Sequence, residues 1–365
     1  MATFGWGSTV NGELGLGGIE EDFILTPREI HWTGGAELEQ AACGTSHTLL
    51  LTKQGKVFSC GNNDYGQLGH DLSRKRPQFV SSLDNYMITQ LSSGAMHSMA
   101  LNEWGQVFTW GSDTHGQLGN ELGAVQATPR VVRSLSTKHV IQIVSGHFHC
   151  LALTNSGEIY AWGMNNYGQL GIGQGPEKVS KPMLVEALSG IPIAFICCGA
   201  HHSFALSTSG AIFAWGKNNF GQLGLNNETH HYYPQQIRGL RSLGVRHIAC
   251  GDDFSVFLTA DGRVFTCGLG SYGQLGHGAI TMRLHREWCW NWPAVQSPKC
   301  LAGGSTRWLS YRPEGVSTAS GWGILANWAC RNPEMFPFRK LLTDPGFHQG
   351  RELGMAMKEI SMGLA

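Results

Sequence analysis

The sequence predicts an all-β protein, a β-propeller of four-stranded blades, and three observations lead to that prediction. A block of fixed internal spacing that begins at Gly44 recurs with a period of 50 to 53 residues. Glycine is abundant, at 50 of 365 residues, while charged residues make up only 14%, against roughly 25% in typical globular chains. Each unit contains four β-prone segments, and stacked units of this kind and length are typical of propellers.

The repeated block runs from Gly44 to Gly69 and predicts a β-hairpin. His47 to Leu51 is apolar on both faces, as in a strand buried between two layers, Gly55 marks a turn, and Lys56 to Cys60 returns. Further copies are Gly94–Gly119, Gly146–Gly171, Gly199–Gly224 and Gly251–Gly276, with a partial copy at Gly7–Gly15.

The return strands place an aromatic residue and then Trp or Cys two residues apart. Side chains at this spacing share one face of a strand, so we expect that face to pack one sheet against the next. The pairs are Phe4 and Trp6, Phe58 and Cys60, Phe108 and Trp110, Tyr160 and Trp162, Phe213 and Trp215, and Phe265 and Cys267.

Two further strands complete each predicted blade. A β-prone run such as Ile141–Val144 precedes the block, and a proline followed by an apolar residue comes after it. Proline is tolerated at a sheet edge, where the missing N–H costs little, so this segment is expected to be the outer strand. The prolines are Pro27, Pro77, Pro129, Pro182 and Pro234.

The loop before each GQLG sequence carries Asn or Asp at one fixed position, where we expect a left-handed backbone. In the last copy Gly270 fills this position and creates a G-x-G-x-x-G match at Gly268–Gly273. No helix pattern follows, so we interpret the match as a repeat loop and predict no cofactor. The Asn and Asp residues are Asn63, Asp113, Asn165 and Asn218.

The repeats stop after Gly276. The next outer-strand proline is due near position 286 and is missing, and no later copy of the block occurs. We therefore divide the chain into propeller repeats at 1–278 and a non-repeat tail at 279–365, expected to be poorly ordered, with a small added domain as the alternative. The strands around Phe4–Trp6 and Thr26–Trp32 are then expected to lack a partner, which leaves the ring incomplete.

Composition argues against several classes of partner. The formal net charge is zero, so we expect neither nucleic acid nor an acidic membrane surface. No apolar run approaches the roughly 18 to 20 residues of a membrane-spanning helix. Five cysteines occupy repeat positions that carry Ser or Trp in other copies, so the cysteines are expected to be core residues rather than disulfides. These five are Cys43, Cys198 and Cys250 at the Ser position and Cys60 and Cys267 at the Trp position. A reducing compartment follows, the cytoplasm, with the nucleus as an alternative.

No catalytic or metal-binding residues are predicted. His47, His97, His149 and His202 recur at one position, which Phe254 fills in the fifth copy, so we expect buried imidazoles with structural hydrogen bonds. The pairs His147/His149 and His201/His202 lack an acidic or Cys partner at ligand spacing. Hydrolase, P-loop and zinc-protease motifs are absent from the sequence.

Taken together, these motifs resemble the regulator of chromosome condensation repeat family over Phe4 to Gly278. The sequences FGWGSTVNGELGLGG and ACGTSHTLLLTKQGKVFSCGNNDYGQLGH are most similar to the amino-terminal propeller of small HERC-type ubiquitin ligases. The resemblance implies a seven-bladed ring, of which about five complete units are present here, followed by an irregular carboxy-terminal tail. It also implies a catalytic HECT domain, which this sequence lacks and which a longer product of the same gene would have to supply, so no enzyme activity is expected of this chain.

The function that this resemblance implies is recruitment of partner proteins or substrates in the ubiquitin-ligase pathway. Specificity in such modules resides in loops, and the segments of variable length after GQLG are the candidates. The alternative is guanine-nucleotide exchange on a Ran-like GTPase, which the founding family member performs with an inserted wedge and a basic amino-terminal tail; the sequence shows neither. The candidate partner-binding residues are Asp71, Arg74, Lys75, Arg76, Glu177, Lys178, Lys181, Glu228, His231 and Tyr232.

Overall fold

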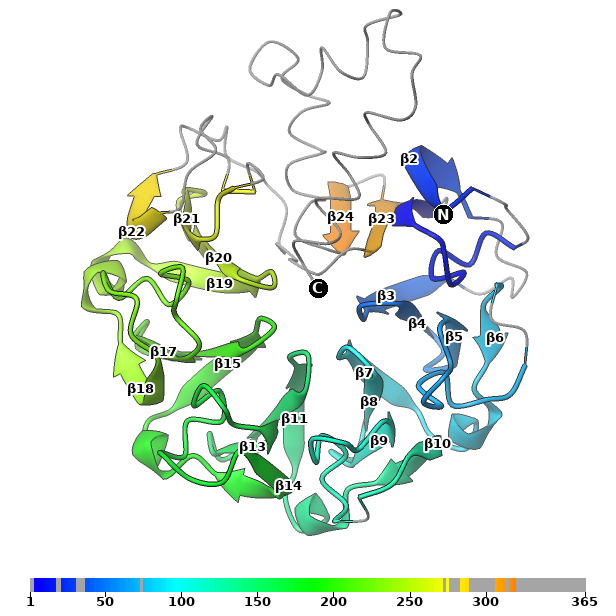
Figure 1. The fold of residues 1–365 in the computed structure, drawn as a ribbon, viewed down its shortest axis with the longest axis horizontal. Helices are drawn as coiled ribbons and strands as arrows, with labels where there is room; N and C mark the ends of the chain where they lie inside the picture. The colour runs from blue at the N-terminus through cyan, green and yellow to red at the C-terminus, as the bar shows by residue number, and fades with distance from the viewer. Residues whose placement is uncertain are drawn as a thin grey trace, which may run out of the picture.

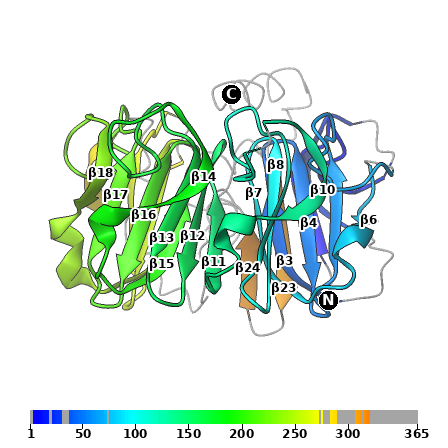
Figure 2. The ribbon, with the colours of Figure 1, turned by 90° about the horizontal axis from the view of Figure 1, so that it is seen from below.

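A computed structural model describes residues 3–17, 21–30, 37–72, 75–121, 123–271 and 274–275, and the backbone of 283–288, 306–312 and 315–319. Within these residues, six four-stranded antiparallel sheets stand around a ring (Figure 1). The strands run between two loop-bearing faces of the ring (Figure 2). The predicted all-β propeller is confirmed. Among the same residues, no helix has the length and apolar character needed to cross a bilayer.

Five of the sheets each come from one stretch of chain, with the first strand innermost and the fourth outermost (Figure 1). The first is β3 (Leu38–Cys43), β4 (His47–Thr52), β5 (Val57–Gly61) and β6 (Gln78–Phe79). The second is β7 (Ile88–Ser93), β8 (His97–Asn102), β9 (Val107–Gly111) and β10 (Gln126–Val131). The third is β11 (Val140–Ser145), β12 (His149–Thr154), β13 (Ile159–Met164) and β14 (Lys178–Leu184). The fourth is β15 (Ile193–Cys198), β16 (His202–Ser207), β17 (Ile212–Gly216) and β18 (His231–Gln236).

The fifth sheet consists of β19 (Val245–Cys250), β20 (Phe254–Thr259), β21 (Val264–Gly268) and β22 (Arg283–Trp288). Its outer strand contains no proline and lies in the segment predicted as a non-repeat tail. The pairing of Gly268 with Arg283 and of Phe265 with Trp288 requires only backbone groups, which every residue except proline supplies in full. The missing proline was therefore a poor guide to where the strands end.

The sixth sheet joins the two ends of the described chain in the order β2 (Phe23–Glu29), β1 (Thr3–Ser8), β23 (Thr306–Arg312) and β24 (Gly315–Ala319). The expectation that the amino-terminal strands lack a partner was wrong. Phe4 pairs with Leu309 and Gly5 with Trp308, so strands from the tail complete this sheet. Sequence periodicity could not reveal them because they carry no copy of the repeat.

Outer strands are followed by short 3-10 helices. Proline lies within β2, β10, β14 and β18 and directly before β6, and each of these strands is at an edge of its sheet, as predicted. The helices are η1 (Ser81–Leu83), η2 (Arg133–Leu135), η3 (Glu186–Leu188) and η4 (Arg238–Leu243).

The aromatic residues of the return strands occupy matching places in successive sheets, as the repeat predicts. Each lies opposite the fourth residue of the preceding strand in the antiparallel register. The pairs are Phe58 with Leu50, Phe108 with Ala100, Tyr160 with Ala152, Phe213 with Ala205 and Phe265 with Phe257.

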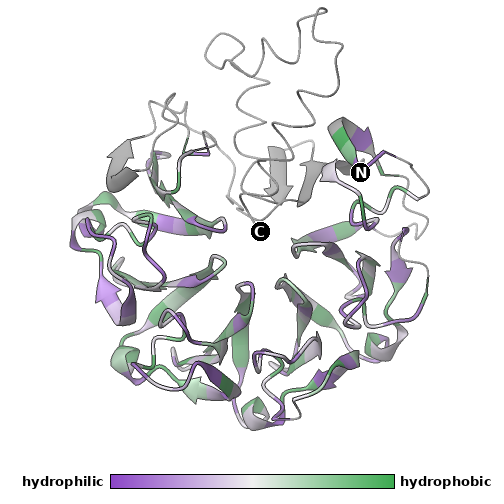
Figure 3. Ribbon diagram, in the orientation of Figure 1, coloured by the Kyte–Doolittle hydropathy of each residue, from purple (hydrophilic) through white to green (hydrophobic). Residues whose placement is uncertain are grey.

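The hydrophobic core lies between neighbouring sheets. Trp110 packs with Leu49 and Leu51 of the preceding sheet, and Trp215 packs with Leu151 and Leu153 in the same way. These Trp side chains are fully buried. Hydrophobic residues are concentrated on the strands, and the loops at the rim are more hydrophilic (Figure 3). Each sheet therefore depends on its neighbour to bury its apolar face.

In the GQLG loops one backbone carbonyl accepts hydrogen bonds from side chains of the next sheet, which links the two sheets. The carbonyl oxygen of Gln67, in the first GQLG loop, accepts hydrogen bonds from Trp110 Nε1 at 2.8 Å and from Ser98 Oγ at 2.7 Å. Gln169 O does the same for Trp215 and Ser203. Where the loop carries Glu13 in place of Gln, its carbonyl still accepts from Thr48 Oγ1 at 2.7 Å and from the Cys60 thiol at 3.6 Å.

The recurring histidines add a further hydrogen bond to these links between sheets. His47 Nε2 lies 2.9 Å from Ser98 Oγ, and His202 Nε2 lies 3.0 Å from Ser255 Oγ. Because each serine hydroxyl donates to a Gln carbonyl, it accepts from the imidazole, which fixes the Nε2–H tautomer. Burial lowers the pKa of His47 to about 4 and that of His202 to about 3. The predicted structural role of these imidazoles is confirmed.

A glutamine in three of the inner strands binds the next inner strand through both ends of its amide. Gln142 in β11 donates from Nε2 to Ile196 O and accepts from Ile196 N at Oε1, both at 2.9 Å. Gln40 and Gln90 make the same pair of bonds to the strands that follow them. We call the contact between the β11–β14 and β15–β18 sheets the clamped interface.

The next contact around the ring has no such glutamine. Phe195 fills the position in β15, and its ring centroid lies 5.0 Å from that of His247 in β19. Cys197 Sγ is 3.3 Å from Cys250 Sγ, and the Cys267 thiol takes the place of a Trp as donor to Gln222 O at 3.4 Å. We call this contact, between the β15–β18 and β19–β22 sheets, the thiol interface.

The expected left-handed backbone at the loop Asn and Asp residues was wrong. Outside the glycines, only Glu121 and Asn226 have positive φ among the described residues. The Asn63 side chain instead accepts a hydrogen bond from Leu68 N at 2.9 Å, and its three counterparts make the equivalent bond. The side chains hold the loop as acceptors, while a following glycine such as Gly66, with φ of 73°, makes the turn.

Candidate partner-binding surface

The described residues among those predicted to bind partners follow the third strand of three sheets, either in the loop that leads to the fourth strand or in the fourth strand itself. Asp71, Lys75, Arg76, Glu177, Lys178, Lys181 and Glu228 are exposed, and His231 and Tyr232 are half-buried. Arg74 lies outside the described residues. Lys178 and Lys181 lie in β14, and His231 and Tyr232 lie in β18, so four of the ten residues belong to outer strands rather than to loops.

The candidate residues come from three segments that follow GQLG, at 71–76, 174–181 and 227–233, and the structure brings the last two together. Tyr232, in β18, donates from its hydroxyl to Asn166 O in the preceding sheet at 3.3 Å, and its carbonyl accepts from Gly173 N at 3.0 Å. The segment that holds Glu177 and Lys178 follows Gly173 directly. The Asp71 segment belongs to the β3–β6 sheet, elsewhere on the ring (Figure 1), where Gly17 N donates to Lys75 O.

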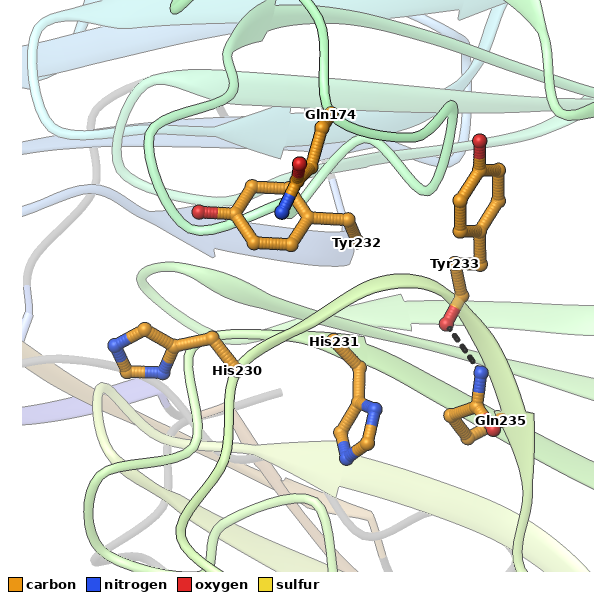
Figure 4. Close-up of a pocket in the computed structure, with 6 residues that line it drawn as sticks. All are labelled: Gln174, His230, His231, Tyr232, Tyr233 and Gln235. Carbon is orange, nitrogen blue, oxygen red and sulfur yellow. Dashed lines mark hydrogen bonds between the residues drawn. The ribbon is translucent and has the colours of Figure 1, made fainter.

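A surface hollow of about 320 Å³ lies between the two segments that meet. Figure 4 draws Gln174 and Tyr232 on one side of it and His230 and His231 on the other. Tyr233 and Gln235 complete the lining, with Gln235 Nε2 donating to Tyr233 O at 3.2 Å. Flat rings and amides line the hollow, so it can accept hydrogen bonds and ring contacts from a partner side chain.

A row of aromatic and imidazole side chains leads away from this hollow across three sheets. It lies on the loop-bearing face of the propeller where the second strand of each sheet begins. The Tyr167 and His230 centroids are 5.2 Å apart, and Tyr167 and His201 are 5.6 Å apart. His201 lies 5.5 Å from His147, which is next to Phe148. The row ends at His115, 4.7 Å from Phe148. We call these six residues the ring row.

Three imidazoles of the ring row, those of His115, His201 and His230, have a pKa below the usual value, which favours their uncharged form. Burial, with further contributions from His147 and Lys217, lowers the pKa of His201 to about 3. Burial also lowers the pKa of His230 and of His115, with neighbouring lysines adding to the effect. Neutral imidazole is both donor and acceptor, so the row offers apolar ring faces together with hydrogen-bonding edges.

Two acidic residues from the fifth sheet fix one side of the ring row. Asp252 Oδ1 lies 3.1 Å from His147 Nε2. Asp253 Oδ1 accepts from Lys217 Nζ at 3.1 Å and from Gln222 Nε2 at 3.0 Å. Lys217 Nζ also lies 5.8 Å from the Tyr167 ring centroid. These contacts hold the rings in place without a ligand, which lowers the entropy cost of binding a partner.

Sequence reasoning missed the ring row, although one signal was present. In four described copies of the loop the residue before GQLG has a ring side chain; these residues are Tyr65, His115, Tyr167 and Phe220. His147 and His201 were considered only as metal ligands. In the part of the chain that the structure describes, no group of three or more metal-ligating side chains occurs.

Comparison with curated proteins places the chain among known relatives. A family model described as the RCC1-like domain matches residues 2–335, beyond the Gly278 limit of the sequence resemblance. The chain is 48% identical over 282 residues to Probable E3 ubiquitin-protein ligase HERC4 of Homo sapiens, covering 77% of this chain and 27% of that protein. For Probable E3 ubiquitin-protein ligase HERC3 of Homo sapiens the values are 42% over 276 residues, 75% and 26%. The chain therefore spans about a quarter of the length of these relatives.

Solved structures show the same architecture. Human WBSCR16 is 25% identical, with a TM-score of 0.76, and the match covers 85% of this chain and 81% of that one. Prp20p from Saccharomyces cerevisiae is 27% identical with a TM-score of 0.75, covering 87% and 80%. The Prp20p structure was described together with its binding to Gsp1p and histones.

Proposed function

The chain belongs to the RCC1-like domain family, and on that premise we propose that it is a protein-interaction propeller that recruits partner proteins without catalysing a reaction. The ubiquitin-ligase setting of its HERC relatives supports the proposal that these partners belong to that pathway. The chain spans about a quarter of the length of those proteins, so their ligase activity is not assigned to it. The role proposed here is recruitment alone.

The observation that supports this proposal best is the continuity of the ring row with the hollow. Aromatic residues are enriched at protein interfaces, and charged residues are depleted at interface centres. Tyr167 contacts both His201 and His230, so the surface runs without a break from His115 to Tyr232. A surface built from three sheets suits a folded partner or an extended segment better than a small substrate.

The test compares two variants that each remove aromatic or imidazole side chains from the surface. His115→Ala/Tyr167→Ala removes one end of the ring row and the side chain that joins His201 to His230. Trp104→Ala is the matched control, because this ring is 57% exposed and lies in the turn between β8 and β9, at the opposite end of the strands. Wild type and both variants are fused to a proximity-labelling enzyme in cells, and the labelled proteins are quantified by mass spectrometry.

We expect a set of ubiquitin-pathway proteins that wild type and Trp104→Ala both label and that the double variant loses. Binding of a purified member of that set is then measured by calorimetry, where loss of an interface hot spot costs about 2 kcal/mol, or roughly 30-fold in Kd. Equal labelling by all three chains would count against the ring row, and labelling without ubiquitin-pathway proteins would count against the setting.

A second candidate function, guanine-nucleotide exchange on a Ran-like GTPase, is favoured by the similarity to Prp20p, which binds Gsp1p. Release of a fluorescent guanine nucleotide from purified Gsp1p is measured with and without this chain, with Prp20p as the positive control. The recruitment proposal expects release at the unassisted rate. Acceleration that depends on the concentration of this chain would instead establish exchange.

A further inference from the structure

Two thiols face each other across the thiol interface. Cys197 is the fifth residue of β15, and Cys250 is the sixth residue of β19. The Cys197 thiol donates to Cys250 Sγ at 3.3 Å. A disulfide has an S–S length of about 2.05 Å, so closing this pair requires the sulfur atoms to approach by little more than 1 Å.

The same two positions touch across two other interfaces, where they carry two Ser residues in one case and Ala and Ser in the other. Ser92 Oγ, at the fifth position of β7, accepts from Ser145 N, at the sixth position of β11, at 2.8 Å. Ser93 Oγ donates to Ala42 O at 3.3 Å between β7 and β3. The approach of these positions is thus a property of the stacked sheets, and the thiol interface differs by placing sulfur at both of them.

The neighbouring Cys198 does not share this geometry. Successive side chains of a strand point to opposite faces, and Cys198 Sγ lies 3.9 Å from Ser203 Oγ of its own sheet. Cys197 is half-buried, whereas Cys250 is buried at 4% exposure. An oxidant in solution therefore reaches Cys197 first, and Cys250 is the thiol placed to react with the product.

We propose that Cys197 and Cys250 form an oxidation site at which a hydroperoxide converts the two thiols to an inter-sheet disulfide. In the first step the Cys197 sulfur attacks one peroxide oxygen, the O–O bond breaks, and a sulfenic acid and an alcohol or water form. In the second step the Cys250 sulfur attacks the sulfenic sulfur. The S–O bond breaks, and the hydroxide leaves as water with the proton of the Cys250 thiol. The two sulfur atoms lose two electrons, which the peroxide gains.

The disulfide would join the β15–β18 and β19–β22 sheets at the interface that lacks a glutamine clamp. Burial raises the pKa of the Cys250 thiol well above its usual value, so this residue is a slow nucleophile towards solutes. Its position against Cys197 compensates, because a neighbouring group reacts at a high effective concentration. In a reducing compartment the bond would be transient and would report oxidant exposure.

The test uses the full chain, purified reduced and exposed to hydrogen peroxide. Remaining thiols are blocked with an alkylating reagent, and the unreduced digest is examined by mass spectrometry. We expect a linked peptide pair that contains Cys197 and Cys250, that has lost two hydrogen atoms, and that disappears after treatment with dithiothreitol. Cys198→Ser is the matched control and should leave the linked pair unchanged.

A second measurement follows folding. Oxidised wild type should melt at a higher temperature than reduced wild type, and dithiothreitol should reverse the shift, while Cys197→Ser should show no shift. The proposal is overturned if Cys250 remains fully alkylatable after Cys197 has been oxidised to the sulfinic acid. It is equally overturned if the link involves Cys198 in place of Cys197.

Discussion

The clamped interface and the thiol interface join equivalent sheets with different side chains. In the clamped interface the buried Trp215 lies beside the small Ala205. In the thiol interface the small Cys267 lies beside the large Phe257. Trp110 and Trp162 likewise share a hydrophobic cluster with Ala100 and Ala152, respectively. In the thiol interface, where the third-strand position carries Cys in place of Trp, the second-strand position carries Phe in place of Ala. The fold therefore specifies the total volume of the two side chains rather than the residue at either position.

The largest effect that could break this comparison is removal of the indole from the clamped interface. Trp215→Ala leaves a cavity and leaves Gln169 O without one of its two donors, and is expected to cost about 3–5 kcal/mol of unfolding free energy. Cys267→Ala, at the matching position of the thiol interface, removes a much smaller group and is expected to cost about 1 kcal/mol. Chemical denaturation of both variants measures the difference. Equal losses would contradict the explanation by the size of the removed side chain.

The second test exchanges the residues of one interface for those of the other. Cys267→Trp alone overfills the contact with Phe257 and is expected to cost about 1–3 kcal/mol. Adding Phe257→Ala recreates the Trp–Ala pair and should recover most of that loss. A double-mutant cycle on the denaturation midpoints gives the coupling between the positions. Additive losses would argue against volume compensation.

The glutamine clamp offers a smaller effect. Gln142→Ala leaves the N–H and C=O of Ile196 without their side-chain partner. Because both groups are only part-buried and water can replace the amide, each lost hydrogen bond is expected to cost about 0.5 kcal/mol, at the low end of the usual range. Phe195→Ala, at the same position of the thiol interface, exposes no such pair and loses mainly ring contact. Hydrogen exchange at the Ile196 amide should therefore speed up in Gln142→Ala. If it does not, the clamp contributes little to local stability.

The smallest effect at neutral pH concerns the buried imidazoles. The folded-state pKa of His202, at about 3, lies below the unfolded value of about 6.5. Its stabilising contribution is therefore complete above pH 6.5 and is lost as pH falls from there towards 3. Phe254 shows that the position accepts a phenyl ring, so His202→Phe should lose about 1 kcal/mol at pH 7. Thermal melts from pH 7 to pH 4 should show a shallower decline for this variant, and parallel declines would contradict the assignment.

The repeats made most of the fold predictable, and the exceptions have a physical cause. A fixed spacing of Gly, His and aromatic residues identifies a sheet because each of these residues has the same turn or packing role in successive copies. The strands β22 and β23 have no such signature, since they are held to β21 and β1 through backbone pairing, which is nearly independent of sequence. That residues 279–365 form a poorly ordered tail stays a prediction.

The candidate surface was predictable only in part. The sequence indicated His231 and Tyr232 because they follow a GQLG loop, and both line the hollow. It could not indicate that His115, Phe148 and His201 meet, because they come from three different sheets and no local pattern encodes contacts between sheets. Their assembly is a consequence of ring curvature.

The hydrogen bonds that link the GQLG loop carbonyls to the next sheet have one more consequence. A main-chain oxygen is present whatever amino acid the codon specifies, so no missense change at that residue can delete the acceptor itself. Glu13 demonstrates this, since it differs from Gln67 in side-chain charge and still receives both donors. Substitutions that weaken the contacts between sheets should therefore be those of the donors, at Thr48, Ser98 or the indoles.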